Sequence, residues 1–191
     1  MSAESIDRRR LYYVGNLSIF MIGLGFAVRA NIAPNLQADI FDKIDLANSA
    51  ALVGEALGVT FTGFALTLLF GSALVDLVGM KRMLLLAALG YIAGSLGLIV
   101  AALAPIGDLE HSVVLISLLL TGLGWGAVEA ASNPMVAALY PLEKTHRLNI
   151  LHAWWPAGIV VGGLLGVAIS SFGLPWELNM LVLLVPALVL T

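Results

Sequence analysis

Uninterrupted apolar runs of about 20 residues restrict the fold of this chain more than any other feature. A run of that length spans the hydrocarbon core of a bilayer as an α-helix. Hydrophobic residues make up 60% of the 191 residues and charged residues only 11%, whereas soluble domains carry about 25% charged residues. The sequence therefore predicts an all-α integral membrane protein. A membrane β-barrel is not expected, because its strands would alternate over about ten residues.

Six transmembrane helices are expected, separated by short polar segments and without a soluble domain. They cover about residues 11–33, 49–75, 83–104, 113–139, 149–171, and 176–191 or beyond. The last run is about 15 residues long, shorter than a full span, so either the helix is short or the sequence is a fragment. The arginines before the first run resemble the start of a signal peptide. That run is too long and lacks an A-x-A cleavage site, so we expect a retained helix.

The distribution of cations predicts the orientation of these helices. If the spans alternate in direction, seven Lys and Arg residues fall on one side of the membrane. They are Arg8, Arg9, Arg10, Lys81, Arg82, Lys144 and Arg147. The opposite side has only Lys43, surrounded by acids. Because cytoplasmic loops carry the excess of positive charge, we expect a multi-pass protein of the inner or plasma membrane with a cytoplasmic N-terminus.

Several functional classes lack support in the sequence. There is no cysteine, which excludes disulfides and thiolate metal sites. We find no hydrolase triad, phosphate-binding loop, metal-ligand cluster or basic stripe for nucleic acid. The chain is therefore expected not to be an enzyme, and no cofactor, bound metal or nucleic-acid partner is predicted.

Glycines in two of the predicted helices suggest where helices pack. In the fifth run three of them recur every four residues, at Gly158, Gly162 and Gly166. This spacing predicts a flat stripe that another backbone can approach. In the fourth run three others are spaced by two, at Gly122, Gly124 and Gly126. Because that spacing places neighbouring members on different faces, we expect them to loosen the helix.

Three charged residues lie well inside the predicted spans: Arg29, Glu55 and Glu129. A charge in a membrane span costs about 2.5 kcal/mol or more, so it faces the bundle interior or a wet cavity. Counting about 1.5 Å per residue from the helix ends places Arg29 and Glu55 at similar depths near the outer surface. We expect one of two arrangements. Either Arg29 and Glu55 form an ion pair, or Arg29 holds an anionic or hydroxyl-rich ligand with the planar N–H donors of its guanidinium.

Glu129 lies about 16 residues into the fourth predicted helix, with no cation close in sequence. A carboxyl group in a low dielectric holds its proton more readily than in water, so we expect Glu129 to gain and lose a proton. Trp125 and Asn133 lie one turn to either side on the same face. In the next helix, His152 and Trp155 can share a face. Their simpler interpretation is an interfacial His and an interfacial or packing Trp.

The segment "SALVDLVGMKR" between the second and third predicted helices resembles the G-x-L-x-D-[RK]-x-G-x-[RK]-[RK] signature of the major facilitator superfamily. Four of its residues match: Asp76, Gly79, Lys81 and Arg82. Ser72 replaces the first glycine and Leu77 the first cation. The resemblance implies the N-terminal six-helix half of a transporter, with a second six-helix half in the same longer chain or in another chain.

Two further motifs resemble the fucose permease branch, the fucose–galactose–glucose:proton symporters. "EAASNP" is similar to its E-T-A-A-N-P motif through Glu129, Asn133 and Pro134. "RLNILHAWWPAGIVVGGLLG" is similar to its R-L-N-L-x-Q-x-F-x-x-x-G motif, with His152 at the usual Gln. The first helix departs from the branch, since Ala30 occupies the position of its Asp and Arg29 that of an Asn. Glu129 alone is then expected to carry the proton.

Three functions remain open at this point. The first is proton-coupled uptake of a sugar or sugar-like solute by alternating access. The second is transport of an anionic organic solute with Arg29 as its counter-ion, and the third is a non-transporting six-helix scaffold or receptor. The expected partners of a transporter are a small-molecule substrate, protons and the lipid bilayer. The candidate substrate contacts are Arg29, Asn31, Trp125, Asn133, Asn149, His152 and Trp155.

Overall fold

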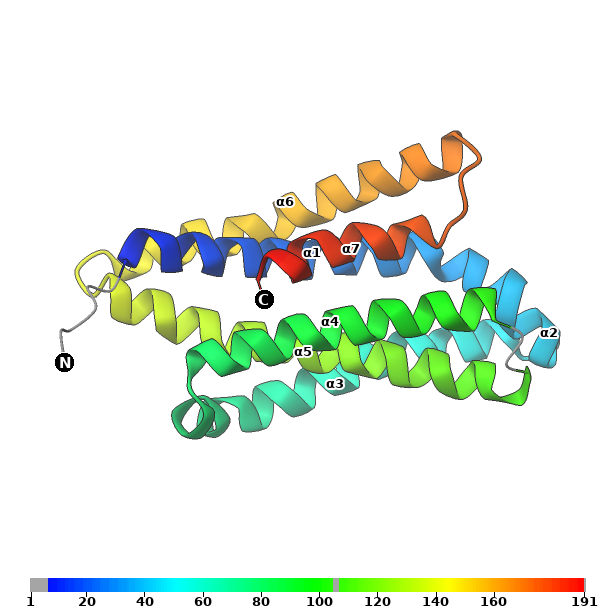
Figure 1. Cartoon of the computed structure of the whole chain (residues 1–191), viewed down its shortest axis with the longest axis horizontal. Coiled ribbons are helices and arrows are strands. Elements are labelled where there is room, and N and C mark those ends of the chain that lie inside the picture. Colours follow the sequence, from blue (N-terminus) through cyan, green and yellow to red (C-terminus); the bar gives the residue numbers. More distant parts are fainter. Residues whose placement is uncertain (1–6, 105–106, 191) are drawn as a thin grey trace.

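Long helices make up nearly all of the computed structural model (Figure 1), which describes residues 7–104 and 107–190 except the side chains of Ser72, Leu74 and Asp108. The long helices are α1 (Arg8–Leu36), α3 (Ser49–Val78), α4 (Met80–Leu103), α5 (Glu110–Leu139) and α6 (Lys144–Ser171), followed by the shorter α7 (Leu178–Val189). Three short elements connect them: η1 (Gln37–Phe41), α2 (Asp42–Asp45) and η2 (Gly107–Leu109). The described residues contain no strand, so the all-α prediction is confirmed.

Five helical segments are long and apolar enough to cross a membrane. Among the described residues they overlap the first five predicted spans. α4 and α5 each begin three residues before the predicted start, α4 ends one residue before residue 104, and the apolar segment of α3 ends at Gly71, before the predicted residue 75. The sixth helix, α7, has 12 residues and ends about midway along the bundle (Figure 1). The sixth span therefore stays a prediction.

The polar segment after the first span is helical rather than a loop. α1 continues through η1 into α2 without a break, although Pro34 lies inside α1 and leaves the Ala30 carbonyl without its usual helical donor. Beyond Pro34 no Gly or Pro occurs up to Asp45, and Leu36 and Ile40 are both buried at helical spacing. Apolar anchoring at that spacing extends the helix beyond the apolar run.

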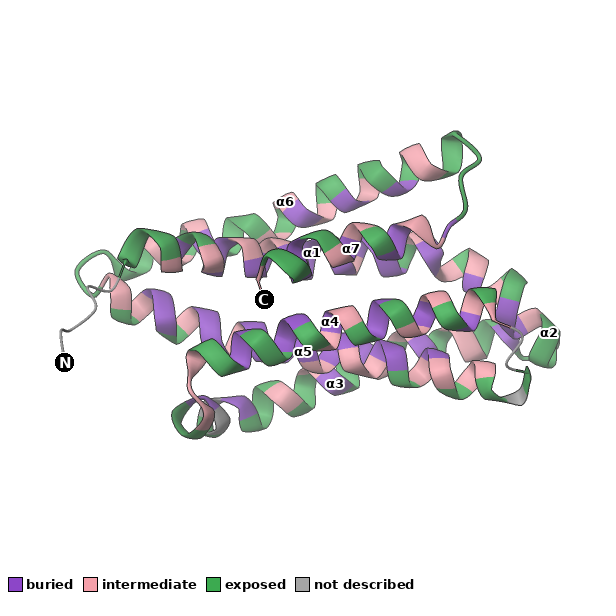
Figure 2. Cartoon of the chain, viewed as in Figure 1, coloured by how far each residue is buried: buried purple, intermediate pink, exposed green. Residues whose placement is uncertain are grey.

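α1 packs on α6, and α5 packs on both α3 and α4, so these five helices form two groups, with α7 in contact with both α4 and α1 (Figure 1). The two groups meet where α1 packs on α5. Buried residues make up 67% of the most apolar window of the first span but only 17% of that window in α3 and in α6, and exposed residues are frequent along both (Figure 2). α1 is thus central, whereas α3 and α6 present most of their surface outward.

The predicted glycine stripe of α6 is confirmed, because Gly158, Gly162 and Gly166 are all buried against α1. A Cβ at Gly158 would overlap the Phe20 carbonyl, and one at Gly162 would come within 2.8 Å of the Ala27 Cβ. This close approach of two backbones, typical of membrane helices, fixes the position of α6 on α1.

We expect Gly158→Ala to lower the free energy of unfolding by about 1–3 kcal/mol, the usual cost of overpacking. Its methyl group would overlap backbone atoms of α1, which cannot rotate away. The matched control is Gly163→Ala on the same helix, where an added Cβ has no atom within 4 Å. Thermal unfolding in detergent measures both. Equal melting temperatures for the two variants would contradict this packing.

The prediction that the glycines of α5 loosen that helix is wrong. α5 is continuous from Glu110 to Leu139. Gly122 and Gly126, four residues apart, lie against the backbone of α3, while Gly124 lies against Ala87 and Tyr91 of α4. The glycines alternate between two sides of α5 because this helix lies between α3 and α4, and each of these packs closely against its backbone.

Candidate functional site

Five aromatic side chains form a continuous series of ring contacts across four helices, and we call this series the aromatic row. It begins at Trp155 of α6, whose ring centroid lies 5.9 Å from that of Phe26 on α1. Phe26 meets Phe61 of α3 at 6.5 Å, and Phe61 meets Trp125 of α5 at 5.6 Å. Phe64 of α3 stacks on Trp125 at 4.3 Å. Residues distant in sequence thus meet in one apolar, π-rich band.

The rings of the row come from α6, α1, α3 and α5, and none comes from α4 or α7. Along the row α1 and α5 run between α6 and α3, and we call this surface the open face. Phe61 is 47% exposed, and Ala30, one turn after Phe26, is also exposed. Phe26, Phe64 and Trp155 are half-buried and Trp125 is buried. The ring edge that reaches this surface at Phe61 is suited to contact the apolar face of a small solute.

Arg29 lies behind the row, on the side of α1 that faces the bundle core. Its guanidinium carbon is 5.5 Å from the Trp125 ring centroid, in a cation–π contact, and the residue is only 6% exposed. Tyr91 of α4 is fully buried and close enough to interact electrostatically with Arg29 and with Glu129. Gly25 allows this arrangement, because a Cβ there would lie 3.1 Å from the Tyr91 ring.

The expected ion pair between Arg29 and Glu55 is not formed. Glu55 is exposed and lies 3.4 Å from Nε2 of His111, the second residue of α5. Trp125, beside Arg29, comes 14 residues later on that helix, about 21 Å at 1.5 Å per residue. Depth counted from the helix ends was misleading, because Arg29 packs beside Tyr91 and Trp125 near the middle of α4 and α5, whereas Glu55 lies beside His111 at the start of α5.

Glu129 is half-buried on α5 and forms no salt bridge among the described residues. Its carboxylate accepts a hydrogen bond of 2.9 Å from the side-chain amide of Asn133, which also donates to the Glu129 carbonyl at 3.0 Å. Two members of the predicted stripe are thus joined directly, while Trp125, one turn earlier, belongs to the aromatic row.

The other candidate contacts are dispersed. Asn31 donates a hydrogen bond of 3.0 Å to the Gly162 carbonyl and so connects α1 with α6. Trp155 belongs to the aromatic row, and its indole nitrogen has no partner among the described residues. Asn149 and His152 are exposed on the first half of α6, and we find neither in contact with the aromatic row.

The signature-like segment forms the turn between α3 and α4. Gly79 adopts φ +89°, a conformation that favours glycine. Asp76, Lys81 and Arg82 are exposed, and no ion pair joins them among the described side chains. The turn glycine has its expected place, whereas the charges are free to contact something outside this chain.

Four contributors to this region were missed from the sequence: Phe26, Phe61, Phe64 and Tyr91. Phe61 and Phe64 are three residues apart, which is a signal for one helical face. Phe26 gives no sequence signal in its apolar run. Tyr91 is one hydroxyl in an apolar helix, and only the packing of α4 on α1 reveals its neighbours.

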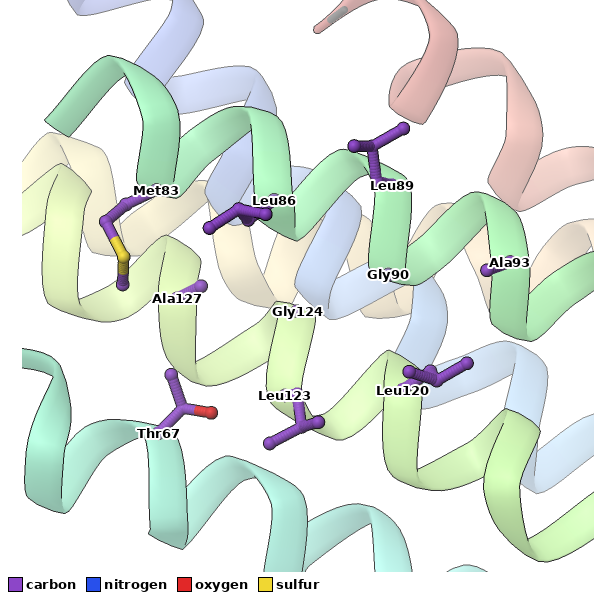
Figure 3. Close-up of a pocket in the computed structure, with 10 residues that line it drawn as sticks. All are labelled: Thr67, Met83, Leu86, Leu89, Gly90, Ala93, Leu120, Leu123, Gly124 and Ala127. Carbon is purple, nitrogen blue, oxygen red and sulfur yellow. The ribbon is translucent and has the colours of Figure 1, made fainter. Parts of the chain in front are cut away.

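An apolar groove of about 420 Å³ lies elsewhere, between α3, α4 and α5 (Figure 3). Its lining includes Met83, Leu86 and Gly90 of α4, and Thr67 is its only polar side chain. No predicted substrate contact lines it. A groove so poor in hydrogen-bonding groups is unsuited to a polar solute.

One family model matches the chain. It is described as Major Facilitator Superfamily, and the match covers residues 6–191. No curated protein and no solved structure is detectably similar to the chain.

Proposed function

Because the chain belongs to the major facilitator superfamily and is a membrane transporter, we propose that it mediates proton-coupled uptake of a sugar or sugar-like solute by alternating access. The observation that carries this proposal is the aromatic row across the open face. Rings from α1, α3, α5 and α6 meet there, with Glu129 one turn from Trp125. An apolar platform beside a titratable acid combines solute binding with proton binding.

Solute binding would use both components of this region. Sugars present apolar faces and hydroxyl edges, which aromatic rings and amides recognise respectively. Phe61 and Trp155 provide ring surface, and Asn133 provides an amide whose Oδ1 has no partner among the described residues. Asn149 and His152, exposed on α6, are proposed to contact the solute when the transporter closes around it.

Proton coupling is assigned to Glu129. It is a half-buried acid in the interior of α5, and its hydrogen-bond partner is the neutral amide of Asn133. No salt bridge among the described residues holds the Glu129 carboxylate. Glu55, another acid in the predicted spans, is instead exposed and lies beside His111.

A second six-helix half, in the same longer chain or another chain, is proposed to pack against the open face and enclose the solute. Transporters of this kind bind solute between two such halves. The low burial of α3 and α6 supports a partner there. The N-terminus is proposed to be cytoplasmic from the cation distribution. An N-terminal tag that reacts with an impermeant external reagent would contradict that orientation.

The test is uptake of labelled hexoses and their acid derivatives by vesicles that contain the full natural gene product. An inward proton gradient should drive accumulation of at least one such solute, and an uncoupler should abolish it. Vesicles without the protein provide the background. Accumulation that persists unchanged in the presence of the uncoupler would contradict proton coupling.

A further inference from the structure

We propose that Arg29, Tyr91 and Trp125 bind an oxyanion carried by the solute, a carboxylate or a phosphate. We call these three residues the donor cluster. The inference rests on the proposed transport function and specifies the substrate as a hydroxylated organic anion. Its basis is a buried set of hydrogen-bond donors that no acceptor satisfies.

The donors come from three helices and meet at the middle of the bundle. Both terminal nitrogens of Arg29, the Tyr91 hydroxyl and the Trp125 indole nitrogen are buried. The Arg29 guanidinium and the Tyr91 hydroxyl are close enough to interact, but no well-formed hydrogen bond among the described residues satisfies any of these atoms. Arg29 and Trp125 touch through the cation–π contact, and Arg29 and Tyr91 both lie beside Gly25. A guanidinium and an indole nitrogen can only donate, so the missing group is an acceptor.

A buried positive charge without a hydrogen-bond acceptor destabilises the folded protein. Buried charges in proteins are normally paired and hydrogen-bonded, yet Arg29 forms no salt bridge among the described residues. The cation–π contact with Trp125 offsets part of this cost but provides no hydrogen-bond acceptor. Arginine presents two parallel N–H groups that match a carboxylate or phosphate, and such a ligand would satisfy charge and hydrogen bonds together.

The position of the cluster connects it with the solute surface. Trp125 belongs both to the aromatic row and to the donor cluster, since its indole contacts Phe61 and Phe64 as well as Arg29. The cluster is closed in this conformation, since Arg29 is 6% and Trp125 7% exposed. A solute lying on the row would direct its anionic group past Trp125 toward Arg29 when the helices move.

The experiment measures ligand stabilisation of the purified full gene product in detergent at constant ionic strength. Glucuronate and glucose form a matched pair that differs by one carboxylate, and gluconate, glucose 6-phosphate, inorganic phosphate and chloride complete the probes. We expect a saturable rise in melting temperature of about 5 °C or more with at least one organic anion, and none with glucose.

Variants test whether the ligand-induced rise in melting temperature depends on the donor cluster. Arg29→Gln should abolish it, and Tyr91→Phe should weaken binding about tenfold, as expected for loss of one hydrogen bond to a charged group. Glu55→Gln, remote from the cluster, is the control and should bind as wild type. Without ligand, Arg29→Gln should melt no lower than wild type, because it removes an unsatisfied charge. A structural arginine would give the opposite result.

Three outcomes would overturn the proposal: stabilisation by none of the organic anions, equal stabilisation of Arg29→Gln, or equal stabilisation by glucose. Stabilisation by phosphate or chloride alone would overturn the assignment of the anion to the solute. None of these results depends on uptake, so proton-driven uptake of a neutral sugar could still be observed. The failure of this inference is therefore distinguishable from failure of the proposed function.

Discussion

Glu129→Gln is expected to abolish proton-driven accumulation of the solute while leaving solute exchange at equal pH intact. With one coupled proton, a gradient of one pH unit can support about tenfold accumulation, and the variant should reach no accumulation at all. The substitution preserves shape. Its side-chain oxygen can still accept the hydrogen bond that Asn133 donates to Glu129, so only the proton site is removed.

The measurement compares two assays on the same vesicles: uptake driven by an imposed pH gradient, and exchange of labelled for unlabelled solute without a gradient. Exchange requires binding and conformational change but no net proton movement. Glu55→Gln serves as the matched control, because it removes another acid of the predicted spans that is exposed beside His111. If Glu129→Gln still concentrates solute against its gradient using protons, Glu129 is not the proton carrier.

Reversing the charges of Arg29 and Glu55 together is not expected to restore the transport that is lost when Arg29 alone is reversed. Arg29→Glu places a carboxylate among Tyr91, Trp125 and the apolar core, where an uncompensated buried charge costs about 3–5 kcal/mol. Transport should fall more than tenfold. Glu55→Arg changes an exposed group whose only salt-bridge partner among the described residues is His111, and should alter stability by less than about 1 kcal/mol.

The double variant Arg29→Glu with Glu55→Arg should therefore be as inactive as Arg29→Glu alone. Transport rate and melting temperature of the two single variants and the double variant complete the cycle. The control pair is Arg147 and Glu143, which do form a salt bridge at 2.8 Å, so that reversal of both can restore their contact. Restored transport in the Arg29 and Glu55 double variant would show that these residues pair, against the structure.

Helix positions could be predicted from the sequence because a bilayer requires long apolar runs. The run over about residues 83–104 became α4, Met80–Leu103, and the glycines of α6 showed which of its faces would be covered. These features are properties of single helices. Each depends only on length, composition and periodicity.

The contacts between helices could not be predicted in the same way. The neighbours of Arg29 depend on the rotation and height of α1, and these are set by close packing of Gly23 on Trp155 and of Gly25 on Tyr91. The sequence offered Glu55 as a partner because both residues seemed to lie near one surface. The proximity of Trp125 and Tyr91 required the three-dimensional arrangement of α4 and α5.

The most direct test of the account asks whether the open face is the wet, solute-contacting surface. The chain has no cysteine, so single cysteines can be introduced into it and treated in native membranes with a charged, water-soluble thiol reagent, with the unsubstituted protein as the background. Thiols react as thiolates and need water. Cysteines at Ala30 and His152, exposed on α1 and α6, should react, and the transported solute should slow the reaction at Ala30. Cysteines at Leu89 and Leu96, exposed on α4, should stay unreactive beneath lipid. Reaction at the two α4 positions with protection of Ala30 and His152 would contradict the account.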